Sequence, residues 1–403
     1  MQAYSVYVHV PFCRRRCSYC DFNTYAGQEG LIPAYVDAVV QEIGWVAQAA
    51  GERLAVHTVY FGGGTPSLLP TEGVERILTG LAAGFELQGE AEITLEANPG
   101  TVEREGLARL RAAGVNRLSL GMQSVHGAEL ALLGREHDFW DVMRAVQWAR
   151  QAGFDNVNLD LIFGLPGQSL AAWQQTLSWA IRLGVEHLSL YALSVEAGTS
   201  LQRWVEGGLV PVPDDDLAAD MYELASEWLA REGYWQYEIS NWARSSYPPG
   251  ETEAPSRASR HNLQYWRNQP YLGVGAGAHG YAAGQRVANV RLPAEYIRRL
   301  SEGARSEGER VFPQSPATAE VVTLKQSDEI AETMMMGLRL TREGVSAQAF
   351  EKRFGIGLEV LFGPQIEQLR RQGLLTWAGQ GGDRLRLTAG GRLLGNRVFA
   401  AFV

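Results

Sequence analysis

Residues 11–22 read PFCRRRCSYCDF and contain all three cysteines of the 403-residue chain, Cys13, Cys17 and Cys20. Their spacing is C-x3-C-x2-C. A 4Fe-4S cluster normally takes four thiolate ligands. Because the chain has three cysteines and no fourth, one iron of such a cluster would lack a protein sulfur. An iron with an open position can bind a small molecule and take part in its chemistry.

The spacing resembles that of the radical-SAM superfamily, in which the free iron binds the amino and carboxylate groups of S-adenosylmethionine (SAM) and can cleave it reductively. A second interpretation is a structural zinc site. Three cysteines and a histidine can hold zinc, and His9 lies just upstream. The spacing alone leaves both interpretations open, together with unliganded thiols. The downstream motifs favour the iron–sulfur cluster.

The composition is that of an ordinary folded protein. With 46% hydrophobic and 20% charged residues, 403 positions are enough for two or three domains. The opening MQAYSVYVHV lacks the basic region and cleavage site of a signal peptide, and no apolar run could span a bilayer. We therefore expect a cytoplasmic protein with reduced thiols. The net charge of −9 argues against nucleic acid as a partner, because phosphate binding needs a basic excess.

The first half of the chain alternates apolar, β-branched stretches with helical periodicity, which predicts an α/β fold with a parallel sheet. Strands are expected near 5–10, 56–61, 93–96, 117–121, 157–163 and 187–190. Helices are expected over 33–49, 71–83, 104–113, 139–152, 170–183 and 217–231. Six strand–helix units predict a partial (β/α)6 barrel with every carboxyl end on one rim. Ligand sites of such barrels gather on that rim. The cysteine stretch directly follows the first expected strand, so we expect it on the same rim.

After Trp235 the pattern changes to short mixed pieces. The Ser- and Pro-rich segment 245–260 predicts a mobile loop. From residue 324, helices over 327–340, 346–354 and 364–372, two strands within 374–387 and a helix over 393–399 resemble a winged helix. The third of these helices has few basic residues, which favours docking over DNA binding. We therefore expect a barrel over 1–240, a connecting segment over 241–323, and a small helical, winged-helix-like domain over 324–403.

Polar residues follow the expected strands at regular places. The glycine run 62–64, followed by Thr65, permits close approach of backbone to a ligand. Further polar candidates near strand ends are Glu96, Gln123, Arg135 and Asp160. One such residue could be a helix cap or a salt-bridge partner. Their regular placement indicates a rim that binds a small polar ligand.

Taken together, the motifs YVHVPFC-x3-C-x2-C, FGGGTPS, LEANP, LGMQS, LGR-x-H and DLIFGLPGQ resemble the oxygen-independent coproporphyrinogen III oxidase group of radical-SAM proteins. The matches run from about Tyr7 to Ala192. The resemblance implies a 4Fe-4S cluster on Cys13, Cys17 and Cys20. It also implies a SAM site, whose residues would be Tyr7, Gly64, Thr65, Glu96, Gln123, Arg135, Asp160 and Ala192.

Within this group, two sequence features distinguish the oxidase from its relatives. The oxidase resembles C-x3-C-x2-C-x-C behind a long leader, whereas here Phe22 replaces the last cysteine and the cluster motif begins at Cys13. Residues 261–266, HNLQYW, resemble the H-N-x-x-Y-W signature of the HemW-type haem chaperones, which bind haem and deliver it to respiratory proteins. Imidazole is the commonest protein ligand of haem iron, so His261 is the candidate axial ligand. His261 could also be a core histidine.

The sequence therefore predicts a haem chaperone on a radical-SAM scaffold, with 4Fe-4S, SAM and haem as cofactors; whether it catalyses turnover stays open. The alternatives are an active coproporphyrinogen oxidase, another radical-SAM methyltransferase or cyclase, and a zinc-stabilised binding module. The expected partners are haem and haem-accepting, respiratory proteins, with a homodimer and peripheral membrane contact as further expectations.

Overall fold

The computed structural model describes residues 3–303 and 310–403, and its internal contacts divide the chain into two units. The first unit comprises residues 1–185, 190–221 and 270–323. The second comprises residues 186–189, 222–269 and 324–403.

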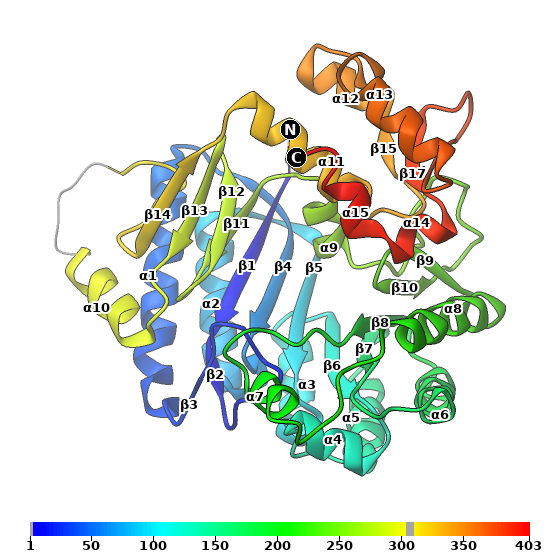
Figure 1. Ribbon diagram of the computed structural model, residues 1–403. Coiled ribbons are helices and arrows are strands. Elements are labelled where there is room, and N and C mark those ends of the chain that lie inside the picture. The colour runs from blue at the N-terminus through cyan, green and yellow to red at the C-terminus, as the bar shows by residue number, and fades with distance from the viewer. Residues whose placement is uncertain (1–2, 304–309) are drawn as a thin grey trace. The chain divides into compact units, whose positions relative to one another are not determined.

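The first unit is built on parallel strands that lie side by side (Figure 1). They are β1 (Tyr4–Val10), β4 (Ala55–Gly63), β5 (Glu86–Ala97), β6 (Arg117–Gln123) and β7 (Val157–Phe163). The sixth expected strand, β8 (His187–Ala192), is divided between the two units, with residues 190–192 in the first. Neighbours from β1 to β7 pair in parallel. Most of β1, β6 and β7 is buried, as expected for a parallel sheet covered on both faces. The predicted partial barrel is confirmed, although β5 begins seven residues earlier than expected.

Helices follow these strands, and some of them begin at a capping side chain. The helices are α1 (Ile32–Ala50), α2 (Thr71–Gly84), α3 (Arg104–Ala112), α4 (Gly127–Leu133), α5 (Phe139–Gln151), α6 (Leu170–Arg182), α7 (Ser200–Glu206) and α8 (Asp215–Arg231). Asp138 caps α5 in a reciprocal capping box with Asp141, and Ser169 caps α6. Such caps satisfy amide groups that have no partner within the helix. Short elements complete this part: β2 (Phe12–Cys13), β3 (Tyr25–Ala26), and 3-10 turns at Glu29–Leu31, Pro66–Leu68 and Pro99–Thr101.

The sheet continues beyond β1, where the sequence indicated only short mixed pieces. The added strands are β11 (Tyr271–Val274), β12 (His279–Ala282), β13 (Gln285–Asn289) and β14 (Thr318–Thr323), with helix α10 (Pro293–Gly303) between the last two. β11 pairs with β1 in parallel, and the others follow antiparallel. The buried carboxylate of Glu42 in α1 accepts hydrogen bonds from the Gly275 amide (2.8 Å), Asn289 Nδ2 (2.7 Å) and the Tyr296 hydroxyl (2.6 Å). This carboxylate ties α1 to the added strands.

The second unit contains a hairpin and a small helical domain. Strands β9 (Tyr234–Glu238) and β10 (Asn241–Arg244) pair antiparallel, and β10 also pairs with residues 187–189 of β8. Helix α9 (Arg260–Trp266) follows the loop over 245–260. Within that loop Ser245 Oγ accepts a hydrogen bond from the Ser256 amide (3.1 Å). Its predicted mobility stays a prediction, as do the domain boundaries at 240/241 and 323/324.

The C-terminal part has the predicted winged-helix order. Its elements are α11 (Gln326–Gly337), β15 (Val345–Ser346), α12 (Ala347–Phe354), α13 (Leu358–Arg371), β16 (Leu375–Ala378), β17 (Arg384–Leu387), α14 (Ala389–Leu393) and α15 (Gly395–Phe399). The three strands form a sheet in the order β15-β17-β16. The expected start of the third helix at Pro364 was wrong. α13 begins at Leu358 because Leu358, Ile366 and Leu369 all pack into one core.

No helix among the described residues is long and apolar enough to cross a membrane.

Candidate cluster and cofactor site

The three cysteines lie on one loop at the carboxyl end of β1, and the backbone fixes both ends of that loop. β2 ends at Cys13 and pairs in parallel with β3. The glycine run after β4 holds the loop from the other side, since the Gly64 amide donates to Val10 O (2.8 Å) and the Thr65 amide to Phe12 O (2.8 Å). A Cβ at position 64 would lie 2.6 Å from Phe12 O and 3.0 Å from Cys13 Sγ. Glycine is needed there because any side chain would push the loop away.

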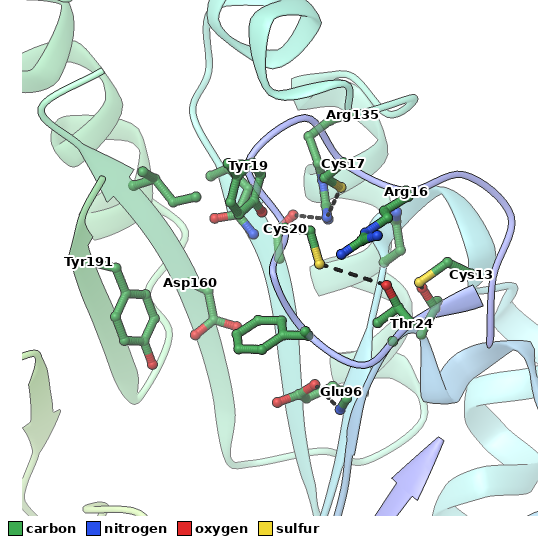
Figure 2. A pocket seen from close by; sticks show the side chains of 18 of the residues that line it. Cys13, Arg16, Cys17, Tyr19, Cys20, Thr24, Glu96, Arg135, Asp160 and Tyr191 are labelled. Atoms are coloured by element: carbon green, nitrogen blue, oxygen red, sulfur yellow. Dashed lines mark hydrogen bonds between the residues drawn. The ribbon is translucent and has the colours of Figure 1, made fainter. Parts of the chain in front are cut away.

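Each thiol faces a hydrogen-bond donor and lines the same pocket of about 390 Å3 (Figure 2). The Thr65 hydroxyl donates to Cys13 Sγ (3.6 Å) and Arg135 Nη1 donates to Cys17 Sγ (3.6 Å). Cys20 Sγ and Thr24 Oγ1 are 3.8 Å apart. Such donors stabilise sulfur in its thiolate form. Without a ligand, burial raises the pKa of Cys13.

The arrangement fits a cluster better than a single ion. Among the described residues, no three His, Cys, Asp or Glu side chains are grouped to hold one metal ion. A 4Fe-4S cluster takes one thiolate at each liganded iron, so three thiols spaced around one pocket suit it.

Two carboxylates from the strands face this pocket. Glu96, from β5, accepts hydrogen bonds from the Tyr60 hydroxyl (2.7 Å) and the Gly63 amide (3.2 Å). Burial raises the pKa of Glu96 to about 7, although the Tyr60 hydrogen bond opposes the shift. Asp160, from β7, accepts from Ser119 Oγ (2.9 Å) and Asn158 Nδ2 (2.9 Å). These bonds fix both carboxylates in place.

Gln123 and Arg135 add polar atoms that the protein leaves unsatisfied. Gln123 ends β6 with φ of 63°, an uncommon value for a residue other than glycine. Its Oε1 is buried without a hydrogen-bond partner, and so is Nε of Arg135. Nη2 of Arg135 donates to Gly121 O (3.1 Å). Buried polar atoms are rarely left unpaired, so these two atoms point to a polar ligand in the pocket.

The pocket brings together residues predicted from separate motifs: Cys13, Cys17, Cys20, Gly64, Thr65, Glu96, Gln123, Arg135, Asp160 and Ala192. Tyr7 does not line it. The Tyr7 hydroxyl lies 3.0 Å from His9 Nδ1 and its ring stacks beside Tyr60, with centroids 6.3 Å apart. Its contact with SAM stays a prediction.

Among the pocket residues that sequence reasoning missed are Tyr19 and Tyr60. Burial raises the pKa of both hydroxyls, which keeps them neutral. The position of each tyrosine in the sequence could have indicated its place in the pocket. Tyr19 lies between two cysteines, and Tyr60 precedes the glycine run by the two-residue step that shares a strand face.

His261 lies in the second unit, on α9, and does not line the cluster pocket. It is 1% exposed. Its Nε2 is 2.9 Å from the Tyr265 hydroxyl, and the two rings meet edge to face. Trp266 packs under the guanidinium of Arg339, 4.4 Å from the ring centroid. The imidazole thus packs against the Tyr265 ring, and a metal at Nε2 would have to displace the Tyr265 hydroxyl.

Comparison with known proteins agrees with the fold. Residues 7–180 match the model of the Radical SAM superfamily, and residues 324–394 match that of the HemN C-terminal domain. Coproporphyrinogen III oxidase (HemN) from Escherichia coli, described as a radical SAM enzyme, shares the fold with a TM-score of 0.81 at 24% identity, covering 100% of this chain and 90% of that one. The chain is therefore a radical-SAM protein with a HemN-type C-terminal domain, and that class implies a 4Fe-4S cluster and SAM.

Relatives that match over nearly their whole length assign the chain to one family within this class. The heme chaperone HemW of Bacillus subtilis is 37% identical over 401 residues, covering 99% of both chains. The heme chaperone HemW of Mycobacterium tuberculosis (strain H37Rv) is 40% identical over 401 residues, covering 98% of this chain and 94% of that one. The chain belongs to the HemW family.

Proposed function

We propose that this protein binds haem and delivers it to haem-accepting proteins, on a scaffold that also carries a 4Fe-4S cluster and SAM. The observation that carries the proposal is the identity with HemW proteins over nearly the whole length of both chains. Phe22 supports it, because this residue stands where the related oxidase motif has a fourth cysteine.

In this proposal Cys13, Cys17 and Cys20 supply the cluster ligands. When bound, the cluster and SAM supply reductive, radical-forming chemistry. The thiols line a single pocket beside hydroxyl and guanidinium donors, which supports the assignment.

The SAM site is proposed around the same pocket. Gly64, Thr65 and Ala192 offer close approach of backbone, while Glu96 and Asp160 hold positive groups of the ligand. The orphaned atoms of Gln123 and Arg135 support this assignment, since a polar ligand would give both of them partners.

The haem ligand is proposed to be His261. Two observations bear on it: the histidine belongs to the HNLQYW motif, and its ring packs edge to face against Tyr265. Ligation through Nε2 requires the ring to release the Tyr265 hydroxyl, so the Tyr265 side chain must move when haem binds. Haem-accepting respiratory proteins are the proposed recipients.

The experiment tests one anaerobically reconstituted preparation both for haem binding and for oxidase activity. Haem is titrated in one arm, and coproporphyrinogen III, SAM and a reductant are supplied in the other. We expect a stoichiometric haem complex and no protoporphyrinogen. Sustained decarboxylation without stable haem binding would instead identify an oxidase.

A further inference from the structure

The second unit contains a cavity of about 540 Å3 that plays no part in the assignments above. Its walls come from α8, β9, β10 and the junction of β17 with α14. Its volume falls within the usual range of small-molecule pockets. Among the described residues that line it, none was assigned to the cluster, SAM or haem.

Positive charge is concentrated in this cavity. Three arginines line it: Arg342, Arg386 and Arg392. Glu251 is the only acidic side chain among the described lining residues, and it pairs with Arg386 (2.9 Å). Three guanidinium groups against one carboxylate leave an excess of two positive charges.

Hydrogen bonds to uncharged groups hold Arg342 and Arg392 in place. Arg342 Nη2 donates to Gly250 O (2.6 Å) and Arg392 Nη1 donates to Gln236 Oε1 (2.6 Å), both neutral acceptors. Nε of Arg392 is buried and has no hydrogen-bond partner. Burial lowers the pKa of both guanidinium groups, and the neighbouring charge of Arg386 lowers it further. Like charges held together in a partly dry cavity favour an anionic ligand.

An aromatic surface adjoins these charges. The indole of Trp235 is 36% exposed, and the Arg342 guanidinium lies 4.9 Å from its ring centroid. Trp242 forms a buried part of the wall. A ligand here can place a flat apolar face beside groups that bind anions.

We propose that this cavity binds the two propionate carboxylates of haem. The proposal rests on the haem-binding function proposed above and names a part of it that the motifs did not. Haem carries two carboxylates on one edge of a flat apolar ring, which matches the excess charge and the adjoining indole. Guanidinium groups bind carboxylates through paired hydrogen bonds.

The test compares ferric haem with haem dimethyl ester, which keeps the ring and iron but lacks free carboxylates. Both are titrated into the reconstituted wild-type protein and into Arg386→Gln and Arg392→Gln. We expect wild type to bind haem more tightly than the ester. Each substitution should weaken haem binding roughly ten- to hundredfold, as loss of a charge-assisted hydrogen bond does, and leave ester binding unchanged.

Two further variants serve as a matched control and as a test in the opposite direction. Arg371→Gln, on the exposed end of α13, is the matched control and should bind haem as wild type does. Glu251→Gln removes the carboxylate of the cavity, so it should strengthen haem binding even if Arg392→Gln fails to fold. Unchanged melting of Arg386→Gln excludes a folding defect.

The outcomes separate this site from the function on which it rests. Equal binding of haem and ester by wild type, or wild-type haem affinity in Arg386→Gln, would overturn the propionate site and leave haem binding intact. Failure of the wild type to bind haem at all would overturn both.

Discussion

At the scale of single residues, Cys17 is one of the three thiols proposed to hold the cluster. Replacing Cys17 with Ala leaves two thiolates, which cannot normally retain a 4Fe-4S cube. We expect loss of the broad visible absorption and of most iron and sulfide after anaerobic reconstitution. Arg14→Ala, an exposed change in the same loop, should keep both. Full iron and sulfide in Cys17→Ala would contradict the ligand assignment, and zinc in the wild type would favour the zinc interpretation.

Glu96 and Asp160 belong to strands whose carboxyl ends face the cluster loop, and their exchange for the neutral amides tests the SAM site. Glu96→Gln and Asp160→Asn each remove a charge without changing shape. The loss of a charge-assisted hydrogen bond should weaken SAM binding by about 1.5–3 kcal/mol, measured by anaerobic calorimetry. Glu105→Gln, an exposed carboxylate on α3, is the control. Wild-type affinity in both pocket variants would mean that SAM binds elsewhere.

The raised pKa of Glu96 makes stability depend on pH in a defined direction. Its pKa is about 7 in the folded protein against an ordinary value of 4.5, mainly because the carboxyl is buried. A raised carboxyl pKa means that the folded state retains a proton that the unfolded chain has lost. The associated stability is present below pH 4.5 and is lost as the pH rises through 7.

In the ligand-free protein, wild type should therefore lose melting temperature relative to Glu96→Gln between pH 5 and pH 8. The amide imitates the protonated carboxyl and does not titrate. Parallel melting curves for the two proteins over this range would show that the pKa of Glu96 is not raised.

At the scale of elements, β11 joins β1 and β12 at a point with no room for a side chain. A Cβ on Gly273 would lie 1.9 Å from the carbonyl oxygen of His279 in β12. Gly273→Ala must therefore move backbone, and we expect a loss of about 2 kcal/mol or more in the free energy of unfolding. In α3, a Cβ on Gly106 would meet nothing within 4 Å. Gly106→Ala should gain up to about 1 kcal/mol from helix propensity. Urea unfolding measures both; equal effects would refute the steric argument.

At the scale of the whole molecule, the proposed haem ligand and the cluster cysteines belong to different units of the chain. We expect His261→Ala to shift or abolish the Soret band of the haem complex while the cluster absorption stays intact. Cys17→Ala should do the reverse. An unaltered haem spectrum in His261→Ala would reject His261 as ligand and leave the chaperone proposal in place. Loss of the cluster in that variant would show that the two sites depend on each other.

The sequence by itself determined what depends on order along the chain. The spacing of Cys13, Cys17 and Cys20 indicates an incomplete ligand set, because ligand count and local spacing are properties of the chain alone. Alternating strand and helix patterns predicted the barrel, since period and length are local signals. From the placement of polar residues after strands, the pocket of Glu96, Gln123 and Asp160 was predicted as well, because parallel strands bring their carboxyl ends together.

Tertiary structure alone decided the features that depend on distant partners. Strands β11–β14 are short and are stabilised by pairing with β1 and with each other. A local sequence pattern does not show which strands will pair. The unpaired Oε1 of Gln123 appears only once neighbouring strands bury it. Arg342 lies far from Arg386 and Arg392 in the sequence. Only folding gathers them around one cavity, because charge density at a site depends on distances in space.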